Sequence, residues 1–205
     1  MSIDNNKIQP IYNNNEIKYI VLSNVVKMLI NRKNINQDDY DKTYKLLVDQ
    51  DNDDLIYKLK INDNKHILLI KIINQKVNGF GKQTIQYEFL TKNKSDYKII
   101  IANSFIDSAK KEIERNYINS EIFAEVDFMF SLLEYHDQPT FIWLDKNSDE
   151  YKTFFEQFLC NKKQIPKFNI EDPVVRYFGK KKWDIAKIIR VSETTGESIS
   201  FRIVS

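Results

Sequence analysis

Apolar residues in the first half of the chain follow two different periods. Between residues 16 and 30 they recur every three or four positions, which predicts a helix, and the same period returns after Asn36, a candidate N-cap for a second helix. Alternating apolar and polar residues then predict two strands around a tight turn. The predicted elements that follow are strands at 55–61 and 66–73, a helix at 84–90, a strand at 97–102 and a helix at 108–117. This order predicts an α/β fold, a small mixed sheet covered by helices.

The second half begins without a Gly, Pro or Ser linker, and its apolar content stays high up to Leu133. Pro139 interrupts the chain, a short strand is predicted just after it, and Ser148 can cap a further helix. We therefore place a domain boundary near residue 125. The predicted domains are residues 1–125 and residues 126–205.

A helix of under two turns is predicted near the end of the chain. Asp172 can cap its free amides, Pro173 is tolerated in its first turn, and Gly179 can supply the left-handed residue that stops it. So short a helix needs tertiary packing to persist.

A β-hairpin is predicted after this helix. Residues 183–191 alternate with apolar side chains on both faces, which is typical of a strand covered on both sides. Gly196 can take a positive φ in the turn, and residues 199–204 form the return strand. The second domain is thus a small α+β unit that ends in a hairpin with one arginine, Arg190 or Arg202, on each arm.

The composition limits the classes of protein to which this chain can belong. Apolar residues make up 42% and charged residues 29% of the 205 residues, as in an ordinary globular chain that can bury a core. No apolar run is long enough to predict a membrane span, and the polar start predicts no secretory signal. The single cysteine, Cys160, permits no internal disulfide and suits a reducing compartment.

Charge is unevenly spread along the chain. The formal net charge is +2, but from Asn161 onward ten Lys or Arg residues accompany five acids, a net of +5. The rest has 21 basic and 24 acidic residues, a net of −3. A basic C-terminal segment could bind an acidic partner surface or a polyanion. The alternative is that these charges only face solvent, and charge alone favours that interpretation.

The sequence predicts neither a cofactor nor a metal site. Two histidines and one cysteine cannot build a zinc site, and an acidic run that begins at Asp49 fails as a calcium loop because Asp54 stands where Gly is needed. A Mg²⁺-dependent nuclease remains an alternative. Asp96 and Lys98 precede a buried strand as a metal-binding pair would, but a solvated turn explains them better.

The last forty residues resemble a known family. Between Gln164 and Val204 the chain reads QIPKFNIEDPVVRYFGKKKWDIAKIIRVSETTGESISFRIV. This string resembles the C-terminal assembly domain of the fifth subunit of eukaryotic nuclear RNA polymerases, a family that includes an archaeal counterpart. The resemblance implies a polymerase subunit that docks on the largest subunit and has no catalytic site of its own. Val191 departs from the family pattern, which has Pro there.

The resemblance also implies a set of docking residues in this unit. We expect folding roles for the prolines and glycines among them, and we favour Arg176 and Arg190 as anchors, because a guanidinium holds a carboxylate bidentately. The candidates are Pro166, Asp172, Pro173, Arg176, Tyr177, Gly179, Arg190, Ser192, Glu193, Thr194, Gly196 and Arg202.

The first half resembles the family's jaw domain more in element order than in identity. That domain is restriction-endonuclease-like and carries a Thr-Pro-Ser-Ala-Lys segment near downstream duplex DNA, which aligns here with residues 106–110. The resemblance implies that Ser108 and Lys110 contact a phosphate at a helix start. Asp107 would repel that phosphate, and as an N-cap it has a purely structural explanation.

The combined interpretation is a two-domain polymerase subunit. Heavy Asn, Ile and Lys usage and the divergent jaw indicate a large cytoplasmic DNA virus such as African swine fever virus, with a protist nuclear polymerase as the alternative origin. The expected location is host cytoplasm and virion, or the nucleus if cellular. Expected partners are the largest and other polymerase subunits and non-specific downstream duplex, with no membrane and no homo-oligomer. A free-standing transcription regulator is a further alternative.

Overall fold

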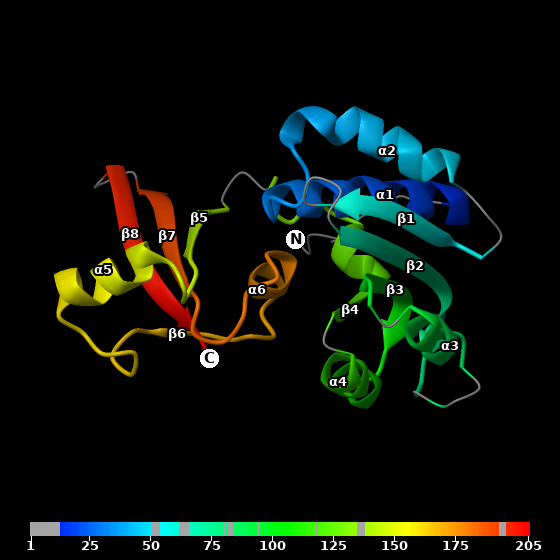
Figure 1. Ribbon diagram of the computed structural model, residues 1–205. Coiled ribbons are helices and arrows are strands. Elements are labelled where there is room, and N and C mark those ends of the chain that lie inside the picture. Colours follow the sequence, from blue (N-terminus) through cyan, green and yellow to red (C-terminus); the bar gives the residue numbers. More distant parts are fainter. Residues whose placement is uncertain are drawn as a thin grey trace, which may run out of the picture. The chain divides into compact units, whose positions relative to one another are not determined.

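The computed structural model describes residues 13–50, 54–61, 66–79, 81, 84–93, 95–117, 119–134, 138–192 and 196–205. The chain divides into two compact units after Phe130, and each unit has its own four-stranded sheet (Figure 1). The fold is therefore mixed α/β with two sheets, as the sequence predicts. No helix within the described residues is long and apolar enough to cross a membrane.

The first unit is a three-layer arrangement of helices around a sheet. Its helices are α1 (Asn14–Asn31), η1 (Gln37–Asp39), α2 (Tyr40–Asp49), α3 (Ile85–Lys92), α4 (Asp107–Asn116) and η2 (Glu125–Phe128). Its strands are β1 (Ile56–Ile61), β2 (His66–Val77), β3 (Tyr97–Phe105) and β4 (Ser120–Ala124). They lie in the order β1-β2-β3-β4, with β1 antiparallel to β2 and the other pairs parallel. Helices α1 and α2 cover one face, and α3 and α4 cover the other (Figure 1).

The central strand β3 shows why both faces are covered. Ile99, Ile100, Ile101 and Ala102 are all at most 2% exposed, although successive side chains of a strand point to opposite faces. Ile100 and Ala102 pack in one cluster with residues of α3 and α4, such as Ile113. The intervening isoleucines face α1 and α2, so the sheet is buried on both sides.

Polar contacts hold α1 to the far edge of this sheet. Arg32, just after the helix, donates two hydrogen bonds to the carboxylate of Glu121 on β4, at 2.9 and 2.8 Å. The Asn24 amide donates to the Phe128 carbonyl oxygen at 2.7 Å. Parallel charge-assisted bonds of this kind fix both position and orientation.

The second unit has one helix on each face of its sheet. Its helices are α5 (Asp149–Phe158) and α6 (Pro173–Tyr177), and its strands are β5 (Thr140–Leu144), β6 (Lys167–Phe168), β7 (Ile185–Ser192) and β8 (Gly196–Val204). The strand order is β5-β7-β8-β6, with β7 antiparallel to β5 and β8, and β6 parallel to β8. Helix α5 packs on Ile185 and Ile203, and α6 packs on Ala186, Ile188 and Val204.

Two predictions about local structure are wrong in detail, and one strand was missed. Asn36 precedes the short η1 helix and makes no side-chain cap bond, and Asp39 precedes α2. The N-cap of α4 is Ile106, so Asp107 is the first helical residue and acts through its charge near the helix dipole. The strand β4 was not predicted. Ser148 does cap α5, because its hydroxyl accepts a bond from the Tyr151 amide at 3.2 Å.

Candidate partner and nucleic-acid surfaces

The start and end of α6 have the predicted geometry. The Asp172 carboxylate accepts a hydrogen bond from the Val174 amide at 2.9 Å, and Pro173 is the first helical residue. Gly179 has φ +62°, and its amide donates to the Arg176 carbonyl oxygen at 2.9 Å. Asp172, Pro173 and Gly179 therefore have folding roles in this unit.

Tyr177 is also part of the folded core, with 7% of its surface exposed. Its ring meets that of Phe178 edge to face, with 5.5 Å between the ring centroids. Pro166 is exposed, but its carbonyl oxygen accepts a bond from the Ile203 amide at 2.9 Å and ties β6 to β8. Tyr177 and Pro166 therefore contribute more to the fold of this unit than to a docking surface.

The sheet face that carries α6 also carries two of the predicted arginines. Arg202 pairs with Ala186 and Arg190 pairs with Ser198 in the β7–β8 register, and these positions share the face on which Ala186 and Ile188 contact α6. Both arginines are exposed, and the Arg202 guanidinium lies 5.8 Å from the centre of the Phe168 ring. Arg176 is half-buried on α6 itself.

The tip of the hairpin is described only in part. The backbone of Ser192 pairs with Gly196, whose φ of +76° confirms the predicted positive φ. Glu193 and Thr194 lie outside the described residues. Their docking roles stay predictions.

The opposite face of the same sheet has an apolar surface that the sequence did not predict. Ile142, Val191 and Ile199 share this face, and they are 45%, 92% and 51% exposed. Phe158 of α5 is 53% exposed and contacts the Phe201 ring, with 5.1 Å between centroids. We call these four residues, Ile142, Phe158, Val191 and Ile199, the α5-face patch.

The α5-face patch corrects the expectation that β7 is covered on both faces. Coverage holds for Ile185, Ala186 and Ile188, but it ends where α5 and α6 end. The alternation in the sequence showed that Ile189 and Val191 share a face with Ile185, so the signal was present. What the sequence did not show was how far the helices reach.

The predicted DNA-contact residues differ in their accessibility. Ser108 is exposed in the first turn of α4, whereas Lys110 is only 7% exposed. The neighbouring Lys111 is exposed. The structure therefore brings Ser108, and not the Lys110 side chain, to the surface at this helix start.

The nuclease alternative requires side chains that can hold a metal ion. No three His, Cys, Asp or Glu side chains gather within the described residues as a metal site would require. Lys98 is 2% exposed and its ammonium donates to the Asn93 carbonyl oxygen, so the prediction of a solvated turn is wrong for this residue. Burial lowers the pKa of Lys98, an effect that the charge of Asp96 partly opposes.

A second lysine of the first unit is buried in a similar way. Lys71 on β2 is 8% exposed, and its ammonium donates to the Asp54 carbonyl oxygen at 2.6 Å. Burial lowers its pKa, while the charges of Asp54 and Glu88 act in the opposite direction. Both lysines satisfy main-chain carbonyls, which is a structural role.

Comparison with known proteins identifies the family to which this chain belongs. Residues 130–204 match the family described as RNA polymerase Rpb5, C-terminal domain, a span that coincides with the second unit. The chain is 31% identical over 196 residues to DNA-directed RNA polymerase subunit 5 of Acanthamoeba polyphaga mimivirus, covering 94% of this chain and 93% of that protein.

Cellular relatives match over a shorter span. The chain is 28% identical over 106 residues to DNA-directed RNA polymerase V subunit 5A of Arabidopsis thaliana, covering 52% of this chain and 47% of that protein. It is 30% identical over 109 residues to the RPABC1 subunit of RNA polymerases I, II and III of Caenorhabditis briggsae, covering 52% and 50%. The chain belongs to the family of the fifth subunit of DNA-directed RNA polymerases.

Proposed function

We propose that this protein is a non-catalytic subunit of a multisubunit DNA-directed RNA polymerase. The second unit docks on the largest subunit, and the first unit forms a jaw beside the incoming duplex. The similarity to the mimivirus polymerase subunit over 94% of the chain carries this proposal, since it includes both units. The helix-covered mixed sheet of the first unit supports a restriction-endonuclease-like jaw.

The α5-face patch is the docking surface that the physical argument favours. Large apolar side chains that stay exposed together on one face mark an interface, because burying them removes apolar area from water. A groove of about 420 Å³ adjoins the patch, between α5 and the sheet, and is lined in part by Phe158 and Phe201. A helix or strand of the largest subunit would complete this side of the sheet.

The arginines supply orientation on the other face. Arg190 is exposed on β7, and Arg202 on β8, so each can hold a carboxylate of the partner bidentately. Arg176 acts from the adjoining helix. We also retain Ser192, Glu193, Thr194 and Gly196 as contacts of the hairpin tip.

Contact of the first unit with duplex DNA is proposed at the start of α4. The exposed Ser108 and the free amides of the first helical turn face a phosphate there, and Lys110 contributes only if its side chain leaves its buried position. Phosphate contacts of this kind are independent of sequence and sensitive to salt. With a net charge of +2, the isolated protein binds DNA weakly.

Catalysis and location follow from this assignment. The large subunits perform phosphodiester synthesis and hold its Mg²⁺. A viral subunit of this kind works in the host cytoplasm and is carried in the virion, whereas a cellular one works in the nucleus.

Co-purification tests the assignment and the docking face together. A tagged chain expressed in its native cells is expected to recover the large polymerase subunits. The double variant Val191→Asp/Ile199→Asp is expected to lose them, since two charges then lie in the interface. The matched control is Val126→Asp/Ile85→Asp, which places the same charges on two apolar residues of the first unit that are 63% and 52% exposed.

Three results are distinguishable in this experiment. Loss with the patch variant alone, while circular dichroism shows both variants folded, supports the proposal. Recovery with the patch variant but loss with Arg176→Ala/Arg190→Ala moves the docking surface to the α6 face. Absence of polymerase subunits with the unchanged chain contradicts the proposed function.

A further inference from the structure

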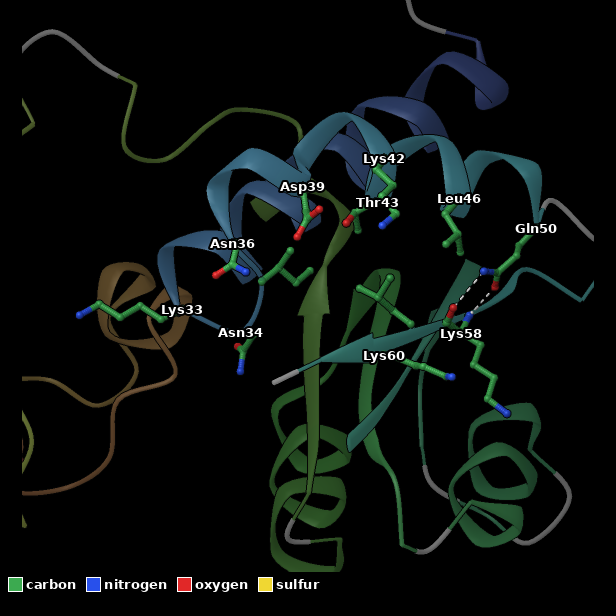
Figure 2. A pocket seen from close by; sticks show the side chains of 12 residues that line it. Lys33, Asn34, Asn36, Asp39, Lys42, Thr43, Leu46, Gln50, Lys58 and Lys60 are labelled. Carbon is green, nitrogen blue, oxygen red and sulfur yellow. Dashed lines mark hydrogen bonds between the residues drawn. The ribbon is translucent and has the colours of Figure 1, made fainter. Parts of the chain in front are cut away.

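The first unit has a groove between α2 and the edge strand β1. Figure 2 shows the connection from α1 to α2 at one end and Gln50 at the other. Its volume of about 750 Å³ lies within the range of roughly 300–1,000 Å³ that is typical of ligand clefts. The surfaces proposed for docking and for DNA lie elsewhere.

Positive charge dominates the lining of this groove. Lys33, Lys42, Lys58 and Lys60 line it, and Asp39 is the single carboxylate among the described residues that do so. Lys42 extends from α2 into the groove (Figure 2). Lys60 pairs with Ile67 on β2, so its side chain lies on the sheet face of Ile67 and Leu69, the face opposite to α2. A segment that extends along the edge of β1 therefore meets Lys42 on one side and Lys60 on the other.

The edge of β1 adds main-chain groups to the groove. The Gln50 side chain donates to the Lys58 carbonyl oxygen at 2.9 Å and accepts from the Lys58 amide at 2.8 Å, which closes the groove at that end. Residues two apart on a strand turn their backbone groups to the same side, so the amide and carbonyl of Lys60 also point outward from the sheet. An extended segment can pair with them.

An apolar side chain completes the lining. Leu46 of α2 lines the groove and is 43% exposed, next to the buried Thr43. We propose that the groove binds a short, extended, acidic segment of a partner protein. The carboxylates of this segment meet Lys42 and Lys60, one of its apolar side chains covers Leu46, and its main chain pairs with Lys60.

A nucleic-acid backbone fits the same groove less well. Phosphates would satisfy the lysines, but they would leave Leu46 without an apolar partner. Asp39 disfavours phosphates and carboxylates alike. An acidic peptide that carries both carboxylates and apolar side chains can meet the lysines and Leu46 together.

Fluorescence anisotropy with a defined probe tests this proposal. The probe is a fluorescein-labelled decapeptide of repeated Glu-Glu-Leu-Leu, which presents both residue types on each face of an extended segment, and the full chain is the receptor. Lys42→Glu/Lys60→Glu is expected to weaken binding about tenfold or more, since two attractive pairs become repulsive. The matched control is Lys45→Glu/Lys76→Glu, which changes the same total charge at two exposed lysines outside the groove and is expected to alter affinity much less.

Each remaining outcome overturns the proposal. Equal loss with both variants shows attraction by the overall charge, and equal binding of a Gln-Leu probe shows that carboxylates are not recognised. Tighter binding of a 12-base-pair duplex that displaces the peptide assigns the groove to nucleic acid. If the probe does not bind, the proposed site is wrong.

NMR shifts of the Leu46 and Lys60 amides on addition of the probe provide a readout without substitution. If the probe binds but these amides do not shift, the peptide binds elsewhere.

Discussion

Both units contain a four-stranded sheet, but the two sheets differ in how far helices cover them. In the first unit, β3 is flanked on both faces, and Ile99, Ile100 and Ile101 are at most 2% exposed. In the second unit, β7 begins in the same way at Ile185, but Val191 near its end is 92% exposed. The cause is the reach of the covering helix, since Val191 lies on the face of α5 but outside the cluster in which α5 packs on Ile185.

This difference separates two uses of apolar residues. Where a strand is covered by helices of its own chain, its apolar side chains stabilise the fold. Where coverage stops, the same residue types remain exposed, and such a surface brings a risk of aggregation unless a partner buries it. The central strand of the first unit is covered by helices of its own chain, and we infer that the end of β7 in the second unit is covered by the polymerase.

The largest expected effect tests this separation within the two strands. Ile101→Ala removes a side chain that is fully buried in β3 and should lower the free energy of unfolding of the first unit by about 3 kcal/mol. Val191→Ala on β7 should change stability by less than about 0.5 kcal/mol. Urea denaturation followed by far-ultraviolet circular dichroism measures both.

Tryptophan fluorescence gives an internal control, because Trp143 and Trp183 both belong to the second unit. If Val191→Ala destabilises the chain as much as Ile101→Ala does, the end of β7 belongs to the core. The contrast between the two sheets is then wrong.

Two caps and the hairpin turn could be predicted because their signals are local, although the same signal misplaced the caps at Asn36 and Asp107. Ser148 and Asp172 each precede the helix that they cap by one position, and Gly196 stands where the turn requires positive φ. A cap forms within about three residues, so the sequence contains the whole interaction. The same holds for Gly179 after α6.

Features that depend on distant segments could not be predicted. The strand β4 has only five residues and pairs in parallel with β3, so neither its length nor its alternation distinguishes it from the apolar run that follows. The burial of Lys98 depends on the Asn93 carbonyl at the end of α3, and the exposure of Val191 depends on where α5 stops. The groove below α2 forms only after α2 and β1 are placed.

An intermediate effect tests whether α6 depends on its cap. Asp172→Ala removes the acceptor of the Val174 amide and should cost about 1 kcal/mol in the second unit. Asp172→Asn keeps an acceptor oxygen and should cost less. Because α6 carries Arg176, a proposed contact of the partner, the substitution should also reduce recovery of polymerase subunits. Tryptophan fluorescence during urea denaturation measures the stability change.

Equal effects of Asp172→Ala and Asp172→Asn would show that the carboxylate charge matters and the hydrogen bond does not. No effect of either substitution on stability would show that packing of Val175 alone holds this helix in place. Helix α6 would then cover the second sheet more stably than its five residues suggest.

The smallest expected effect concerns the buried ammonium group of Lys98 in the first unit. Burial lowers the pKa of Lys98 in the folded state below the ordinary value of 10.5, so on raising the pH the native state releases this proton before the unfolded state does. While the unfolded chain binds more protons, stability rises with pH. The stability of the unchanged protein relative to Lys98→Met should therefore increase as the pH rises through the lowered pKa of Lys98 toward 10.5, and then level off.

Urea denaturation of both proteins in steps from about pH 7 to about pH 10 measures this difference, and all other titrations that the two proteins share cancel in it. Lys111→Met, at an exposed position of α4, is the matched control for the loss of a lysine from the first unit. A difference for Lys98 that stays flat over this range would mean that burial does not disfavour its charged form. Water would then reach the first sheet at Lys98. The solvent exposure of β3 and that of β7 would differ less than the burial of their side chains suggests.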